Sequence, residues 1–190
     1  MGCCDKKRVK LHDKTFEVMI PASKIDESIS KIAERVNADY AGAETPLFLG
    51  VLNGSFIFMA ELMKKIEFNC ELSFVKLASY SGTSSTGKVQ ELIGLKNNIE
   101  GRNVIIVEDI VDTGESIEHL VRSLEGHRPR SIEVVTLFFK PDSYSKQIPI
   151  KYPAMSIGNE FIVGFGLDYE DYYRNLPFVG VLKPAVYQDK

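Results

Sequence analysis

The chain has 190 residues, of which 44% are apolar and 26% charged. This length and composition fit a single globular domain, residues 1–190, and exclude a mostly disordered chain. The net charge of −3, from 23 basic and 26 acidic residues, argues against binding nucleic acid through a basic surplus. No apolar run approaches the roughly 20 residues that span a bilayer. We therefore expect a cytoplasmic enzyme or binding domain with neither nucleic acid nor a membrane as partner.

Helical and strand patterns alternate through the first half of the chain. Apolar residues recur at helical spacing or form short continuous runs. These patterns predict helices at 24–38 and 56–66 and strands at 46–52, 71–77 and 89–95. Residues 79–87 are small or hydroxylated apart from Tyr80, which indicates a flexible loop at about 79–88.

The same alternation continues in the second half. The clearest buried strand is predicted at 103–107, and further strands at 132–139 and 160–167. A helix is predicted at 116–125, closed by Gly126. Alternating strands and helices imply parallel β-α-β units, so we expect an α/β fold with a mostly parallel twisted sheet flanked by helices.

The run from Glu108 to Ser116 concentrates three carboxylates within five residues, directly after the predicted strand 103–107. Ligands of open α/β sheets bind at the carboxyl ends of the strands, so this run is the first candidate for a site. The structural alternative is a solvated acidic turn with Ser116 capping the next helix. Because like charges repel one another, a plain turn has no need of three acids, and a functional role is favoured.

The run divides into two chemical parts. Asp112–Ser116 is a turn entering a helix, where backbone N–H groups, the helix dipole and the hydroxyls of Thr113 and Ser116 suit a phosphate. Glu108 and Asp109 suit sugar hydroxyls or Mg²⁺, because carboxylates accept hydrogen bonds and ligate hard cations. Phosphate, diol and divalent metal together indicate a phosphorylated sugar.

Other motifs fit less well. The chain has no G-x-x-x-x-G-K-[ST] for a P-loop and no G-x-S-x-G for an esterase. Asp112-Thr113-Gly114 also occurs in aspartic proteases, but those are β proteins, and here a helix is predicted to follow. There is no C-x-x-C, and no histidine lies at metal-ligand spacing from another His or Cys, so zinc is not expected.

The segment VIIVEDIVDTGES, residues 104–116, resembles the 5-phosphoribosyl 1-diphosphate (PRPP) binding motif of type I phosphoribosyltransferases. Flanking segments extend the resemblance to hypoxanthine-guanine phosphoribosyltransferases over about residues 10–182. These segments are 52–56, 76–80, 139–141 and 160–177. The resemblance implies the type I phosphoribosyltransferase fold, with a small hood subdomain built from the N- and C-terminal segments.

The resemblance also implies an activity, which is Mg²⁺-dependent transfer of the phosphoribosyl group of PRPP to hypoxanthine or guanine. The products would be IMP or GMP and pyrophosphate, and the enzyme would be a homodimer or homotetramer. A xanthine-preferring relative and a non-catalytic PRPP-binding regulator are the alternatives. The regulator is disfavoured because Asp112, Lys140, Phe161 and Asp168 all match residues of the catalytic members.

Individual roles follow from the same resemblance. The catalytic residues would be Asp112, as base toward the purine N–H, Lys140, as donor to the purine 6-oxo group, and Arg174, as a pyrophosphate contact. The PRPP site would comprise Glu108, Asp109, Ile110, Val111, Asp112, Thr113, Gly114, Glu115, Ser116, Leu52, Asn53, Gly54, Ser79 and Tyr80. Purine would contact Ile110, Lys140, Phe161, Ile162 and Asp168, and the metal Glu108, Asp109 and Asp168.

Several positions carry specific expectations. The family's pyrophosphate loop, Leu52–Gly54 here, often contains a cis peptide bond, and its middle residue is often basic, so Asn53 is expected to act through its backbone. Glu115 stands where relatives often have Lys or Asn, and its side chain is expected to face solvent. Residues 79–88 match the family's lid. Glu108 and Asp109 can face one ligand only if the strand has ended before them.

Overall fold

The computed structural model describes residues 8–11, 14–78, 90–93 and 98–181. Its central sheet has the strand order β5-β4-β3-β6-β7-β8, in which all neighbours are parallel except β5 and β4. The strands are β3 (Leu47–Leu52), β4 (Glu71–Ala78), β5 (Gln90–Ile93), β6 (Asn103–Val111), β7 (Ser131–Phe139) and β8 (Tyr152–Ser156). The predicted α/β class with a mostly parallel sheet is therefore confirmed.

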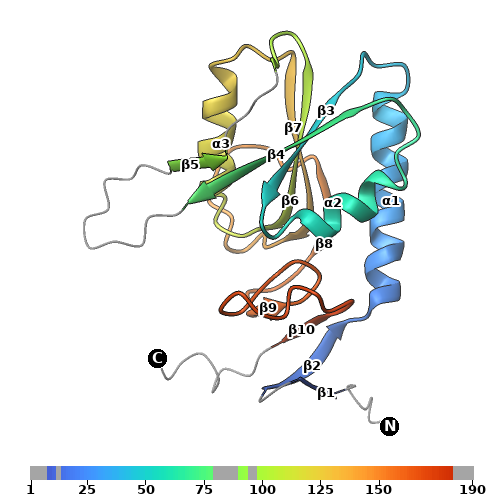
Figure 1. The fold of residues 1–190 in the computed structure, drawn as a ribbon, viewed down its shortest axis with the longest axis vertical. Coiled ribbons are helices and arrows are strands. Elements are labelled where there is room, and N and C mark those ends of the chain that lie inside the picture. The colour runs from blue at the N-terminus through green and yellow to red at the C-terminus, as the bar shows by residue number, and fades with distance from the viewer. Residues whose placement is uncertain (1–7, 12–13, 79–89, 94–97, 182–190) are drawn as a thin grey trace.

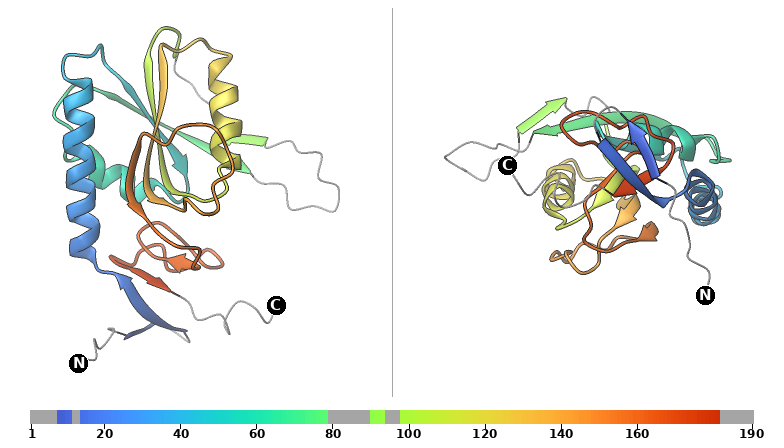
Figure 2. Two further views of the ribbon diagram at one scale, coloured as in Figure 1. Left: turned by 180° about the vertical axis from the view of Figure 1, so that it is seen from behind. Right: turned by 90° about the horizontal axis from the view of Figure 1, so that it is seen from below.

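Helices cover both faces of this sheet. The helices are α1 (Ala22–Tyr40), α2 (Phe56–Met63) and α3 (Glu115–Glu125). Figures 1 and 2 show α1 and α3 on opposite sides of the sheet. Alternating residues of β6 serve the two sides, because Ile105 and Val107 belong to the core cluster of α1 and α2, whereas Val104 and Ile106 belong to that of α3. Both apolar faces are thereby buried, as a parallel sheet requires.

A second, smaller sheet is built from both ends of the chain. Its order is β1-β2-β10-β9, formed by β1 (Arg8–Leu11), β2 (Lys14–Ile20), β10 (Val179–Val181) and β9 (Ile162–Val163). All of its pairings are antiparallel. It lies at one end of the central sheet (Figure 1), and the segment after β9 touches the loop that follows β3. The second sheet therefore covers the carboxyl ends of the parallel strands.

The predicted elements need several corrections. The strand predicted at 103–107 continues to Val111, and the one predicted at 160–167 is reduced to Ile162–Val163. The helix predicted at 56–66 ends at Met63. The strands β1, β2, β8 and β10 were not predicted, because short strands carry little periodicity. Among the described residues, no helix has the length and apolarity needed to cross a bilayer.

Candidate active site

The carboxyl end of β6 enters α3 through a tight turn. The strand ends at Val111, and α3 begins at Glu115 with Gly114 as its N-cap residue. Gly114 has a left-handed φ of 86°, which glycine adopts at little cost. The N-cap residue has no side-chain cap hydrogen bond, so the structure contradicts the alternative in which Ser116 is the cap.

This turn offers free backbone donors to an anion. The first helical hydrogen bond runs from the Glu118 N–H to the Gly114 carbonyl, at 2.9 Å. The N–H groups of residues 115–117 therefore have no partner within the helix, and they lie at the positive end of its dipole. Glu108 and residues 110–117 line a cavity of about 110 Å³ at this point. Glu115 is exposed, as expected. The geometry suits a phosphate group.

The segment that follows β7 packs against this turn. A Cβ on Gly114 would lie 2.4 Å from Cε2 of Tyr144, so the ring packs directly against the glycine. The Tyr144 hydroxyl donates to the Ile148 carbonyl, at 2.5 Å, and the Ser145 N–H donates to the Thr113 carbonyl, at 3.3 Å. Sequence reasoning missed Tyr144, because it lies in a segment without any periodic pattern.

Glu108 and Asp109 lie inside β6 rather than beyond its end. The strand pairs with β7 at Glu108 and at Ile110 but not at Asp109. Asp109 is only 7% exposed, and its Oδ1 accepts the Ile110 N–H at 3.0 Å. The two carboxyl groups also share a hydrogen bond. The two carboxyl groups are therefore close to each other although the strand continues, and of the two only Glu108 lines the cavity at the turn.

Burial sets the protonation of this pair. Burial, the Asp109 charge and the bond between the carboxyls all raise the pKa of Glu108 well above its ordinary value. Burial also raises the pKa of Asp109 to about 6, although the nearby N–H groups, Glu108 and Arg174 oppose this. Oε2 of Glu108 is enclosed and has no hydrogen-bond partner among the described residues. Such a pair suits a ligand that supplies hydroxyl donors or a cation.

The Leu52–Gly54 loop lies directly over Asp109. The peptide bond between Leu52 and Asn53 is cis, the geometry that the family resemblance suggests. A Cβ on Gly54 would lie 1.7 Å from Oδ2 of Asp109, so only glycine allows this approach. Asn53 is exposed and uncharged, so this loop can offer an anion neutral N–H donors but no side-chain charge.

Lys140 and Asp112 meet beside the turn although they lie 28 residues apart in the sequence. Each follows one of two parallel neighbouring strands, β7 and β6, whose carboxyl ends meet at the same edge. Nζ of Lys140 lies 2.9 Å from Oδ2 of Asp112. Lys140 is 8% exposed, whereas the Asp112 side chain is 46% exposed and lines the cavity. The buried Lys140 is thus paired with a carboxylate that a ligand can reach.

Phe161 presents an aromatic face near the second sheet. It precedes β9 and is 37% exposed, so it lies outside that strand and outside the buried core. Its ring meets Tyr169 edge-on, with centroids 6.0 Å apart and planes at 87°. Ile162 is buried, and the partly buried Ile110 lines the cavity. The Phe161 ring is therefore partly exposed and packed against a second aromatic side chain.

Arg174 and Asp168 hold each other within the segment after β9. Nη2 of Arg174 lies 2.7 Å from Oδ1 of Asp168, and Nη1 donates to the Gly166 carbonyl at 2.8 Å. The other Asp168 oxygen accepts the Asp171 N–H at 2.8 Å. The positive charge of Arg174 also acts to lower the pKa of Asp109. The segment after β9 therefore interacts electrostatically with the buried acid of β6.

The structure does not unite every predicted site residue. Ser79 and Tyr80, with the predicted lid at 79–88, lie outside the described residues. No three acidic, histidine or cysteine side chains of the described part form a metal-binding group, so Glu108, Asp109 and Asp168 do not converge. Mg²⁺ fits Glu108 and Asp109 in a different manner, because this ion usually takes one or two carboxylates and completes its shell with waters and substrate phosphates.

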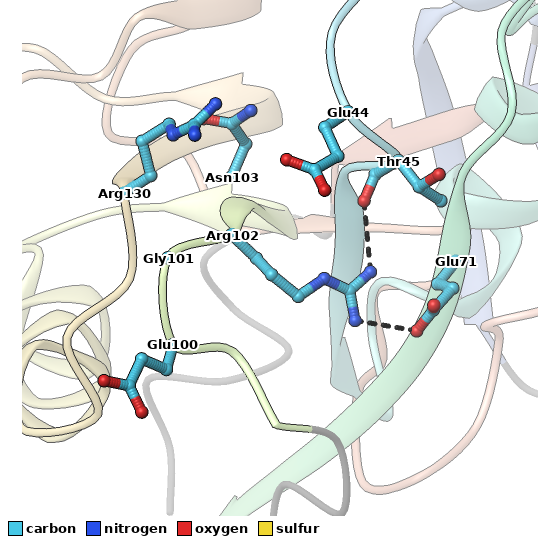
Figure 3. Close-up of a pocket in the computed structure, with 8 residues that line it drawn as sticks. All are labelled: Glu44, Thr45, Glu71, Glu100, Gly101, Arg102, Asn103 and Arg130. Atoms are coloured by element: carbon cyan, nitrogen blue, oxygen red, sulfur yellow. Dashed lines mark hydrogen bonds and ion pairs between the residues drawn. The ribbon is translucent and has the colours of Figure 1, made fainter.

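A larger cavity lies at the opposite end of the sheet. It has a volume of about 410 Å³, and Figure 3 shows its polar lining. Its central Arg102 is already bound to Glu71, at 2.9 Å, and to the Thr45 carbonyl, at 3.1 Å. It sits at the amino ends of the parallel strands, where α/β sheets rarely bind ligands. The carboxyl-end site is therefore the better candidate.

Comparison with known proteins identifies the family of this chain. A family model of the phosphoribosyl transferase domain matches residues 21–170. A hypoxanthine-guanine phosphoribosyltransferase of Lactococcus lactis is 44% identical over 177 residues, which cover 92% of this chain and 96% of that protein.

Solved structures give the same result. A structure of the Trypanosoma cruzi hypoxanthine phosphoribosyl transferase superimposes with a TM-score of 0.86 at 31% identity, covering 95% of this chain and 97% of that one. A Staphylococcus aureus hypoxanthine phosphoribosyltransferase gives 0.83 at 39% identity, covering 90% and 93%. The chain therefore belongs to the hypoxanthine-guanine phosphoribosyltransferases, a family of purine salvage enzymes.

Proposed function

We propose that this enzyme transfers the phosphoribosyl group of PRPP to hypoxanthine or guanine, with Mg²⁺, to give IMP or GMP and pyrophosphate. The observation that carries the proposal is the pairing of Asp112 with Lys140, at 2.9 Å, on the rim of the anion-binding turn. A proton acceptor, a cationic donor and a phosphate site thus lie within one small region. The names of the relatives support the choice of a 6-oxopurine.

The turn would hold the phosphate of the phosphoribosyl group. Backbone N–H groups of residues 113–117 and the hydroxyls of Thr113 and Ser116 are the donors, and the exposed Glu115 points to solvent. Glu108 and Asp109 would accept hydrogen bonds from the ribose hydroxyls, which satisfies the enclosed Oε2 of Glu108. This fixes the ribose ring, and orientation of this kind contributes much of the rate enhancement in reactions between two substrates.

A 6-oxopurine would satisfy both members of the Asp112–Lys140 pair. Its 6-oxo group accepts from Lys140, and its ring N–H donates to Asp112. As the bond from the ribose C1′ to pyrophosphate breaks and the bond to the purine nitrogen forms, Asp112 takes the proton of that nitrogen. Phe161 would cover one face of the purine, while Ile110 and Ile162 border it and Asp168 lies at its edge.

The leaving pyrophosphate would lie between the Leu52–Gly54 backbone and Arg174. Arg174 now pairs with Asp168, so it would exchange this partner for the ligand. When bound, Mg²⁺ offsets the negative charge of the pyrophosphate as it departs. Glu108 and Asp109 are the residues that would hold the ion. The lid proposed at 79–88, with Ser79 and Tyr80, would exclude water from the activated ribose.

The proposal includes the wider organisation of the protein. We infer that residues 1–190 form one phosphoribosyltransferase domain, with the second sheet acting as its hood. We also expect a cytoplasmic homodimer or homotetramer. One of the structural relatives, from Trypanosoma cruzi, was studied for its oligomeric state, which makes mass measurement in solution the direct test here.

The decisive experiment combines PRPP and Mg²⁺ with hypoxanthine, guanine, xanthine or adenine in turn, and measures pyrophosphate. We expect release with hypoxanthine and guanine. A preference for xanthine would favour a xanthine phosphoribosyltransferase activity. If none of the bases caused pyrophosphate release, the proposal would be overturned in favour of a PRPP-binding regulator.

Asp112→Asn tests the mechanism itself. This change should lower turnover at least about a hundredfold, the usual scale of a lost general base, while PRPP still binds. Asp142→Asn changes an exposed carboxylate that has no role in the proposed mechanism and is the matched control. Turnover close to that of the wild type in Asp112→Asn would remove Asp112 from the mechanism.

A further inference from the structure

The segment after β9 crosses the Leu52–Gly54 loop at one very close backbone contact. A Cβ placed on Gly166 would lie 2.0 Å from the carbonyl oxygen of Gly54, and 3.2 Å from its carbonyl carbon. A methyl group does not fit at such a distance. Gly166 also has a φ of 102°, a conformation that glycine adopts far more readily than other residues. The contact therefore depends on the absence of a side chain.

The same loop makes a second very close contact. A Cβ on Gly54 would lie 1.7 Å from the buried carboxylate of Asp109. The segment after β9 thus contacts the loop after β3 through Gly166 and Gly54, and that loop contacts the strand β6 through Gly54 and Asp109. Neither contact leaves room for one extra carbon atom.

Gly166 is itself held in place by hydrogen bonds. The Gly166 N–H donates to the Arg174 carbonyl at 2.9 Å, and Nη1 of Arg174 donates to the Gly166 carbonyl at 2.8 Å. Nη2 of Arg174 is bound to Asp168 at 2.7 Å. Because Gly166 is fixed by these bonds, its contact can fix the loop beneath it.

We propose that Gly166 is a positioning residue for the Leu52–Gly54 loop. Its contact with the Gly54 carbonyl sets where the backbone donors of that loop lie. The identity of the ligand rests on the proposed function, in which this loop binds the pyrophosphate group of PRPP. The purine-binding segment, which contains Phe161 and Asp168, would then determine the position of the pyrophosphate loop. A displacement of about 1 Å in such a group can cost about a hundredfold in rate.

Gly164 provides a matched control within the same segment. It has the same φ of 102°, and a Cβ there would lie 2.1 Å from the Phe178 carbonyl oxygen. Gly164→Ala therefore introduces the same strain and a similar backbone clash, but within the second-sheet region. The two alanine variants should lose thermal stability to a similar extent, and only Gly166→Ala disturbs the loop directly.

The first readout is amide hydrogen exchange of the ligand-free protein at the start of α2. The Ser55 N–H bonds to the Val51 carbonyl at 3.3 Å, and the Phe56 N–H to the Asn53 carbonyl at 3.5 Å, so these amides report on the loop. Gly166→Ala should speed their exchange at least about tenfold relative to Gly164→Ala. Equal exchange in the two variants would overturn the proposal, whatever the enzyme's substrate is.

The second readout is kinetic. Gly166→Ala should raise the KM for PRPP and for pyrophosphate in the reverse reaction at least about tenfold more than Gly164→Ala does, with similar purine KM values in both. Equal changes would overturn the inference, whereas an inactive wild type would contradict the proposed function and leave the exchange test decisive.

If Gly166→Ala does not fold, Arg174→Lys carries the exchange test. This variant removes the Nη1 bond to the Gly166 carbonyl without adding atoms. Faster exchange at Ser55 and Phe56 would support the proposal, and unchanged exchange would overturn it.

Discussion

Replacing Asp109 with Asn should stabilise the ligand-free protein at neutral pH. Burial raises the pKa of Asp109 to about 6 from an ordinary 3.8. At about 1.4 kcal/mol per pKa unit, the ionised carboxylate costs the native state about 3 kcal/mol. Asn keeps an oxygen for the Ile110 N–H and can donate to Glu108, but it does not ionise. The variant thus removes the charge while preserving the local hydrogen bonds.

The sign of the pH dependence follows from proton binding. The native state keeps the Asp109 proton up to about pH 6, whereas the unfolded chain loses it near 3.8. The free energy of unfolding of the wild type should therefore fall as the pH rises between these values. About half of the 3 kcal/mol is lost between about pH 5 and pH 8. Asp109→Asn also removes the charge that helps to raise the pKa of Glu108, which should flatten the curve further.

Urea unfolding followed by circular dichroism measures this difference. Wild type, Asp109→Asn and the exposed control Asp142→Asn would be compared across that pH range, with EDTA present to remove divalent ions. We expect the advantage of Asp109→Asn over the wild type to grow with pH, and Asp142→Asn to follow the wild type. Parallel curves for Asp109→Asn and the wild type would refute the reasoning that a buried carboxylate is being forced to ionise.

Three further predictions concern other parts of the site. Lys140→Ala should raise the purine KM at least about tenfold, the scale of one lost charged hydrogen bond, with little change for PRPP, in initial-rate assays; an unchanged purine KM would contradict its role. Asp171→Gly should raise the free energy of unfolding by up to about 1 kcal/mol, because Asp171 has a φ of 65° and its side chain is 91% exposed. A lower melting temperature would show that the side chain matters more than the strain. Mg²⁺ alone should hardly change the melting temperature, whereas Mg²⁺ with PRPP should raise it, because the ion needs substrate oxygens; a large shift with Mg²⁺ alone would indicate a site made by protein alone.

Local sequence was sufficient for the features that depend on neighbouring residues. The run from Glu108 to Ser116 is continuous, and small residues and apolar spacing predicted its turn and helix, whereas the strand before it was predicted to end at 107 and in fact ends at Val111. The exposed turn before α3 follows from that pattern, as does its suitability for a phosphate. The alternation of strands and helices also sufficed for the α/β class, because burying both faces of a parallel sheet imposes long apolar runs on its strands.

Features that join distant segments were beyond local reasoning. In the second sheet, only β9 lies within a predicted strand, and β1, β2 and β10, which come from both ends of the chain, were not predicted. Phe161 resembles a core residue until the two-residue length of β9 leaves it exposed. Similarly, Gly166 belongs to a G-x-G pattern without obvious meaning, and only its approach to Gly54 gives it one.

The residues themselves therefore determined the chemistry that is available, namely carboxylates and backbone donors after one buried strand, a lysine after the next, and an aromatic residue near the C-terminus. Tertiary structure decided which of them act together. Lys140 reaches Asp112 because parallel neighbouring strands end at the same edge of the sheet. Glu108 and Asp109 hold raised pKa values because folding buries them, Asp109 against a loop that a distant glycine contacts. Proximity and burial are properties of the packed chain, and they do not exist in the sequence before it folds.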